Sequence, residues 1–221
     1  AIAINYTSPM KDIINDWYNG VKSLLPENYT ESGVMLLDKI VAALNKYLQS
    51  GNNSDYQEYL SLKSKWKALN IPGLNGWGEA PGNIMTVTKN GVAYFVIPGL
   101  KFGNIFIAPE PQRGWEAKSD LLYHSSAVAP THQYLAAYYY MQKEYSSAMV
   151  FIGRHATHEW LPGKEVLLST TDYGSIVVGD VPQIYFYISD GLGEGLEAKR
   201  RGFAVMITSL YQSLRQPNCN S

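Results

Sequence analysis

Apolar residues recur at helical spacing through most of the first 70 positions. Residues 10–24 carry one such stripe, and residues 34–48 carry a second. Ser8-Pro9 is a typical helix start, with serine as the cap and proline in the first turn. We expect a loop at 51–54 and a third, shorter helix at 55–68. The simplest interpretation of these stripes is core packing.

The pattern changes after residue 70. Glycine and proline crowd residues 70–82, which is typical of turns. Residues 84–88 and 92–97 then resemble strands, and Asn90-Gly91 between them strongly indicates a hairpin. A further strand is expected at 104–108.

Strand and helix patterns alternate in the rest of the chain. We expect a helix at 131–145, a buried parallel strand at 148–153, short apolar runs of undetermined type at 175–178 and 184–188, a helix at 192–201 and a strand at 203–208. This alternation favours an α/β fold, in which a helical N-terminal segment precedes a mostly parallel strand–helix sheet with a small β-hairpin. The predicted domains are a helical segment at 1–70 and an α/β domain at 71–221, with the hairpin near 84–97.

Composition and charge exclude several classes of protein. Hydrophobic residues make up 46% of the 221 positions, so the chain can bury a sizeable core. The formal net charge of -1 argues against a nucleic-acid partner. No apolar run reaches the roughly 18 residues of a membrane-spanning helix, so we expect no membrane partner. The single cysteine, Cys219, favours a reducing compartment, and we expect a cytoplasmic protein.

The densest cluster of reactive side chains directly follows the predicted strand at 148–153. It contains Arg154, His155, His158 and Glu159. Ligands of open α/β sheets bind at the carboxyl ends of strands. If the segment is helical, His155 and Glu159 share one face, where an imidazole and a carboxylate could hold a divalent ion or move a proton. Taken alone, polar residues that satisfy a loop are the simpler interpretation, and the spacing is not that of H-E-x-x-H zinc proteases.

Two other stretches offer weaker signals for anion binding. The run Gly191–Gly195 superficially resembles a dinucleotide fingerprint, but Leu196 stands where the third glycine belongs and Glu194 would face the pyrophosphate. Lys199 and Arg200, near the end of the same predicted helix, could bind an anion or form a solvated face. Pro162-Gly163-Lys164 lacks the glycine spacing of a Walker A motif, so the chain shows no nucleotide triphosphatase site.

The stretch before the predicted helix at 131–145 adds further candidates. Arg113 could bind a carboxylate in a bidentate manner, and Trp115 could line a site for a flat ligand, although such a tryptophan more often packs in the core. On the residues alone, His132 is expected to have a capping or core role.

Several longer motifs together resemble one family. The sequence is similar to the large subunits of cobaltochelatases and magnesium chelatases in the W-G-x-x-P-G turn at 77–82, in the run 97–109, in Pro130–Tyr134, in Glu159–Glu165, in 179–185, and in Gly193–Gly195 with Ala198–Gly202. The order and separation of these motifs agree over about residues 76–208, whereas residues 1–70 add little that is distinctive.

The resemblance implies a fragment from the middle of a longer subunit that binds a tetrapyrrole and a metal ion, as part of a ligase of the cobaltochelatase type. A separate AAA+ partner would hydrolyse ATP, and the substrates would be a divalent metal, Co²⁺ or alternatively Mg²⁺, and a corrin- or porphyrin-type ring. The fragment alone should be inactive. The catalytic residues implied are Glu159, as base and ligand, and His155, as ligand. Further metal ligands would be His158 and His132, and the ring would contact Arg113, Trp115, Trp160, Lys164, Lys199 and Arg200.

The sequence departs from the family pattern H-x-G-T-H-G at the site itself. Phe151 replaces the first histidine, Arg154 the threonine and Ala156 the glycine, and Glu110 stands where glutamine is usual. These changes leave the identity of the metal undetermined. One alternative is a paralogue that binds a tetrapyrrole or a metal without catalysis. Another is an unrelated metal-dependent hydrolase that uses His155, His158 and Glu159.

Overall fold

The structure is a computed structural model. It describes residues 2–5, 9–25, 28, 30–71, 84–113, 125, 127–145, 147–153, 161–187 and 192–208.

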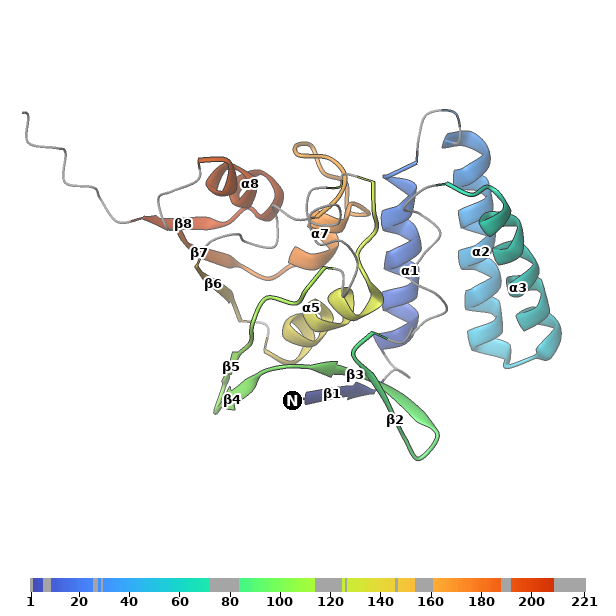
Figure 1. Cartoon of the computed structure of the whole chain (residues 1–221), viewed down its shortest axis with the longest axis horizontal. Helices are drawn as coiled ribbons and strands as arrows, with labels where there is room; N and C mark the ends of the chain where they lie inside the picture. Colours follow the sequence, from blue (N-terminus) through green and yellow to red (C-terminus); the bar gives the residue numbers. More distant parts are fainter. Residues whose placement is uncertain are drawn as a thin grey trace, which may run out of the picture.

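Helix α1 (Pro9–Lys22) links the helical N-terminal segment to the rest of the molecule. On one side it packs against α2 (Thr30–Ser50), which forms an antiparallel pair with α3 (Asn53–Ala68). On its other side it packs against α5 (His132–Glu144) and α7 (Tyr173–Val178), as Figure 1 shows. Its helical apolar stripe, which includes Ile13, Trp17 and Val21, is buried in these contacts.

The contact of α1 with α7 requires a glycine at position 20. A Cβ atom there would lie 2.4 Å from ring carbons of Tyr173, which is closer than van der Waals contact allows. The Tyr173 hydroxyl also donates to the Trp17 carbonyl oxygen at 2.6 Å. The two helices are therefore joined by close packing and by a buried hydrogen bond.

Helix α5 forms the centre of the core. Its residues from His132 to Tyr140 are all buried, so the helix is enclosed on every side rather than along one stripe. Thr131 is the N-cap, and its side chain accepts a hydrogen bond from the backbone N–H of Tyr134.

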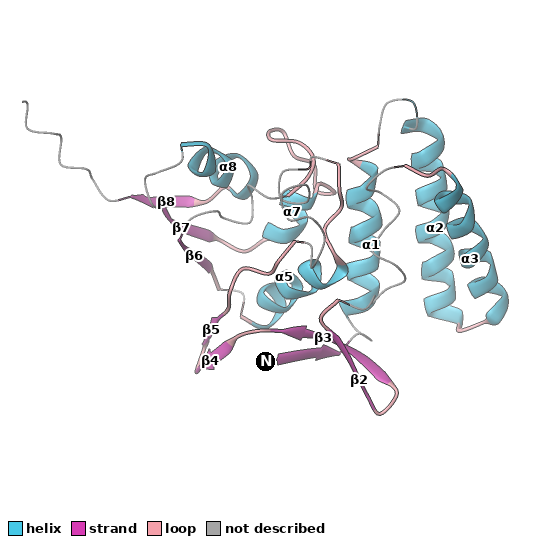
Figure 2. Cartoon of the chain, viewed as in Figure 1, coloured by secondary structure: helices cyan, strands magenta, loops and turns pink. Residues whose placement is uncertain are grey.

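Two small antiparallel sheets lie beside this core (Figure 2). Strand β3 (Val92–Ile97) pairs with β1 (Ile2–Asn5) and with β2 (Thr86–Lys89). Asn90 and Gly91 have positive φ angles of 51° and 75°, as a two-residue type I′ turn requires. Strands β4 (Leu100–Phe102) and β5 (Ile105–Ile107) form a separate hairpin.

The third sheet is parallel and has the order β6-β7-β8. Its strands are β6 (Met149–Gly153), β7 (Gln183–Tyr187) and β8 (Val205–Thr208), and α8 (Leu192–Gly202) joins the last two. Ala198 of α8 packs on Tyr185 and Ala204, together with the half-buried Phe151 and Met206. This helix therefore covers one face of the sheet.

The structure confirms the predicted fold class and most of the elements. The run at 175–178 belongs to a helix, and the run at 184–188 contains a strand. The loop predicted at 51–54 is too long, because α3 begins at Asn53. Strands β1 and β4 were not predicted. The strand at 148–153 is parallel, but the prediction that it is buried is wrong for Val150 and Ile152, which are exposed.

One core cluster includes residues of the helical segment and residues beyond position 130, from Ile13 to Val181. The domain boundary near residue 70 stays a prediction. Within the part of the chain that the structure describes, no helix combines the length and apolar character needed to cross a bilayer.

Candidate functional site

The predicted centre follows the carboxyl end of β6. All three strands of the parallel sheet run in the same direction, so Gly153, Tyr187 and Thr208 end at one edge. The candidate residues His155, His158, Glu159 and Trp160 follow Gly153 directly, but they lie outside the described residues, as does Trp115. Their mutual geometry therefore stays a prediction.

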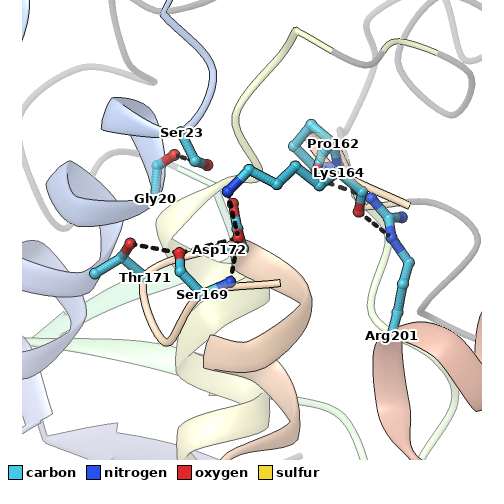
Figure 3. Close-up of polar contacts among 8 residues, drawn as sticks. All are labelled: Gly20, Ser23, Pro162, Lys164, Ser169, Thr171, Asp172 and Arg201. Carbon is cyan, nitrogen blue, oxygen red and sulfur yellow. Dashed lines mark hydrogen bonds and ion pairs between the residues drawn. The ribbon is translucent and has the colours of Figure 1, made fainter. Parts of the chain in front are cut away.

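The chain is described again from Leu161, in a loop that Arg201 of α8 holds. The Arg201 Nη1 atom donates to the Leu161 carbonyl oxygen at 2.7 Å, and Nη2 donates to that of Pro162 at 3.3 Å. The Nε atom donates to the Lys164 carbonyl oxygen at 2.9 Å, as Figure 3 shows. Arg201 is itself buried, and burial lowers the pKa of its guanidinium, opposed by the charge of Glu197. One side chain thus fixes the backbone immediately after the candidate segment.

A buried carboxylate supports the same loop from the opposite direction (Figure 3). The Asp172 Oδ2 atom accepts hydrogen bonds from the backbone N–H of Ser169 at 2.6 Å and from its hydroxyl at 3.0 Å. The Lys164 ammonium, which is half-exposed, lies 3.4 Å from the same oxygen. Burial alone would raise the pKa of the Asp172 carboxyl, but the bonds from Ser169, aided by Ser23 and the Lys164 charge, outweigh it and hold this pKa below its ordinary value.

His132, a predicted metal ligand, is buried at the start of α5. Its ring centroid lies 5.3 Å from that of Trp17, and burial lowers its pKa to about 4, with a further contribution from the charge of Lys63. The imidazole is therefore neutral at pH 7. No cluster of three or more histidine, cysteine or acidic side chains suited to a metal ion occurs among the described residues, which do not include His155, His158 and Glu159.

Arg113, a predicted ring-binding residue, is also buried. Its Nη2 atom donates to the carbonyl oxygens of Ser125 and Val128. These bonds hold together two parts of the chain that precede α5.

Next to Arg113, a small cavity of about 120 Å³ lies between the strand end at Ile97-Pro98, the run Ala108–Gln112 and one face of α5. Glu110 is one of the residues that line it. Both oxygens of the Glu110 carboxylate accept from the Tyr138 hydroxyl, at 2.9 and 2.7 Å, and one also accepts from the Tyr134 hydroxyl at 3.0 Å. Burial raises the pKa of Tyr134 well above its ordinary value, and the Glu110 charge adds to this shift. The carboxylate therefore joins the loop to the central helix.

The two remaining cationic candidates, Lys199 and Arg200, are exposed on α8. The third member of this basic run, Arg201, was not among the predicted site residues, yet it is the one that holds the loop. Its signal in the sequence is helical spacing, because Glu194, Ala198 and Arg201 recur on one face of α8 and all three are buried.

A family model described as CobN/Magnesium Chelatase matches residues 19–218. An uncharacterized protein of Methanocaldococcus jannaschii is 35% identical over 86% of this chain and 18% of its own length. The aerobic cobaltochelatase subunit CobN of Pseudomonas aeruginosa is 38% identical over 62% of this chain and 11% of its own length. The solved catalytic subunit of cobaltochelatase from Mycobacterium tuberculosis has a TM-score of 0.54 and 32% identity, over 66% of this chain and 13% of that subunit.

The match over most of the chain shows that it belongs to the CobN/magnesium chelatase family. This confirms the family that the sequence motifs indicated. The chain spans less than a fifth of the length of each of these relatives.

Proposed function

We propose that this chain is part of the large subunit of an ATP-dependent chelatase. The subunit inserts a divalent metal ion, with cobalt as the first candidate, into a corrin- or porphyrin-type ring. A separate AAA+ partner hydrolyses ATP. Glu159 accepts protons from the ring and transiently binds the metal, and His155 is the matching imidazole ligand.

One structural observation carries this proposal. The segment with the family signature leaves the carboxyl end of a parallel strand at Gly153 and returns at Leu161, where Arg201 binds the backbone. Ligands of parallel sheets bind at this edge. We propose that the segment presents its imidazole and its carboxylate at this edge.

The chemistry of metal insertion requires the residue types that this segment contains. Insertion replaces two pyrrole N–H protons with one divalent cation, so a base must accept protons close to the incoming metal. Glu159 can serve as that base. An imidazole such as His155 suits cobalt better than magnesium, which prefers oxygen ligands. His158 and His132 are the further candidate ligands.

The ring itself needs apolar walls and cations for its peripheral carboxylates. We propose Trp115 and Trp160 for the walls. The exposed side chains of Lys164, Lys199 and Arg200 are available as cations. The buried guanidinium of Arg113 donates hydrogen bonds to backbone carbonyl oxygens, so we propose that it acts by holding the loop before Trp115.

The proposal is tested with the full-length subunit, its AAA+ partner, ATP and Co²⁺. We expect Glu159→Gln to lower the rate of metal insertion at least 100-fold, because the variant keeps the shape of the side chain but loses the base. Ring affinity, measured by the change in ring absorbance or fluorescence, should change less than about threefold, since the macrocycle is bound mainly through its face and periphery.

The matched control is Glu165→Gln, which makes the same change at an exposed position of the neighbouring loop. This variant should insert metal at the rate of the unaltered subunit. Normal turnover by the Glu159 variant would exclude Glu159 as the base.

A second candidate function is a binding protein that holds a tetrapyrrole without inserting metal. Phe151, at the position of the first family histidine, supports it, because its half-buried ring packs against the core and offers no metal ligand. Ring binding without insertion of any divalent metal by the unaltered complex would favour this candidate.

A further inference from the structure

One face of the parallel sheet is lined with apolar side chains. In the register of the sheet, Val150 stands beside Ile184 and Val205, and Ile152 stands beside Phe186 and Ile207. These six residues, the open face, point to the same side. Ile152 is 82% exposed, Val205 63% and Val150 50%. Parallel sheets are normally covered on both faces, so this surface is incomplete as it stands.

The winding of the chain explains why α8 does not cover the open face. The strands lie in chain order, β6-β7-β8. Connections between parallel strands of one sheet are right-handed in nearly all proteins, and we take both connections here to follow that rule. Successive right-handed connections in one direction place their helices on the same face. Buried Tyr185 and Ala204 pack under α8 on that face, opposite the open one.

The same argument identifies the edge at which the sheet must continue. A strand added beyond β8 through a right-handed connection would place its helix on the face that α8 already covers. A helix on the open face requires the chain to wind in the other direction, past β6. Among the described residues, β6 pairs only with β7, and none of them occupies its other edge.

We propose that a strand–helix unit from another part of the full-length subunit completes this sheet. Its strand pairs in parallel with the free edge of β6, and its helix covers the open face. This proposal rests on the chain being part of a longer chelatase subunit, as proposed above. The length of the relatives supports it, because the matched region is only 18% of the archaeal relative and 13% of the solved catalytic subunit.

The added strand would also complete the candidate site. Reversal of winding next to β6 creates a crevice at the carboxyl end of β6, where the open sheets of α/β proteins bind their ligands. The segment that follows Gly153 carries His155 and Glu159.

Cysteine labelling of the folded full-length subunit tests the proposal. Ile152→Cys is placed on the open face, and Phe203→Cys is the matched control, because both side chains are 82% exposed and Phe203 lies outside the face. The rate of reaction with N-ethylmaleimide is measured for the peptide that carries each cysteine and compared with the rate in denaturant. We expect Ile152→Cys to react at least tenfold more slowly than Phe203→Cys. Equal rates, whether fast or slow, would overturn the proposal.

Two further measurements identify the segment that covers the open face. Val205→Cys, on the same face, should be protected in the same way and serves if Ile152→Cys does not fold. A photo-cross-linker attached at either position should capture a peptide from outside residues 1–221 of the same subunit, at a yield that does not depend on protein concentration. Capture of a second copy, or protection only in the presence of the AAA+ partner, would overturn the proposal.

Amide exchange of the unsubstituted subunit tests the added strand. The peptide covering β6 should exchange as slowly as that covering β7, because both strands then have two neighbours. Rapid exchange of about half of the β6 amides would show a free edge and overturn this part. None of these readouts requires metal or ring, so loss of the proposed chelatase function would leave them unchanged.

Discussion

At the scale of single residues, Arg201 shows how helix geometry separates side chains that look alike in sequence. Lys199, Arg200 and Arg201 are consecutive cations near the end of α8. Only Arg201 falls on the buried face of the helix, where its guanidinium reaches three backbone carbonyls. A planar group with several fixed donors suits this arrangement, whereas an ammonium cannot bond all three carbonyls in the same geometry.

We therefore predict that Arg201→Lys destabilises the protein by about 2–3 kcal/mol, since it leaves buried carbonyl oxygens without donors. Metal insertion should fall as well, and it should fall more steeply than ring affinity, because Arg201 positions the loop after Glu159. Urea unfolding of the full-length subunit measures the first effect, and parallel insertion and ring-binding assays measure the second.

Arg200→Lys is the matched control for stability. The residue precedes Arg201 and is exposed, so this variant should change the free energy of unfolding by less than about 0.5 kcal/mol. Equal stability of the two variants would mean that the guanidinium of Arg201 contributes little to the loop.

At the scale of elements, the interface between α1 and α5 contains a carboxyl group with a perturbed pKa. Asp16 of α1 accepts a hydrogen bond from the Tyr139 hydroxyl of α5. Burial raises its pKa from 3.8 to about 6, and the charge of Asp12 on α1 adds to the shift while that of Lys143 on α5 opposes it. The folded protein therefore binds a proton at this site more tightly than the unfolded chain does.

This difference predicts a pH dependence of stability. A raised pKa stabilises the fold below about pH 4, and the contribution is lost as pH rises through about 6. Asp16→Asn keeps an acceptor for Tyr139 but does not titrate. Between pH 4.5 and 7.5 the unaltered protein should lose about 1 kcal/mol more stability than this variant, a value reduced for solvent screening. Urea unfolding across this range is the measurement.

Met35→Ala is the control for this experiment. Met35 is exposed on α2 and carries no titratable group, so this variant should leave the slope of stability against pH as it is. Parallel curves for the unaltered protein and the Asp16 variant would contradict the assignment.

The same elements show which parts of the fold local patterns can predict. Helices α1, α2, α5 and α8 carry signals within their own sequence, and the Asn90-Gly91 turn fixes a hairpin through two positive φ angles. Strand β1 has no such signal, because its place depends on pairing with β3, where Ile2 meets Ile97. The apolar run of β6 predicts a buried strand. Whether both faces of its sheet are covered depends on segments elsewhere in the sequence, so the run itself carries no signal for it.

At the scale of the whole molecule, sequence motifs identified the family and located the candidate segment. The motifs could not distinguish cationic side chains that are exposed to solvent from those that donate hydrogen bonds to backbone carbonyl oxygens. Arg113 and Arg201 are both buried on carbonyl oxygens, while Lys199 and Arg200 are exposed. That distinction comes from tertiary packing, which places Ser125 or Leu161 within reach of a side chain far away in sequence.

The change of composition near residue 70 and the packing of α1 make different predictions about cooperativity. Composition alone would allow residues 1–70 to unfold separately. However, the indole N–H of Trp17 donates to the Pro130 carbonyl oxygen at 2.8 Å, and the core cluster continues from Ile13 through α5 to Val181. We therefore expect the helical segment to unfold together with α5, with residue 70 marking a change of structure rather than a limit of cooperativity.

Ile40→Ala tests this expectation, because Ile40 of α2 is fully buried and far from α5 in sequence. The cavity should cost about 2–4 kcal/mol. In urea-dependent amide exchange of the full-length subunit, we expect the peptides of α2 and α5 to lose protection by the same free energy. Met35→Ala, at an exposed position of the same helix, should change neither by more than about 0.5 kcal/mol. Loss of amide protection confined to α2 and α3 would instead establish residues 1–70 as a separate folding unit, because the destabilisation would then not reach α5 through the contacts of α1.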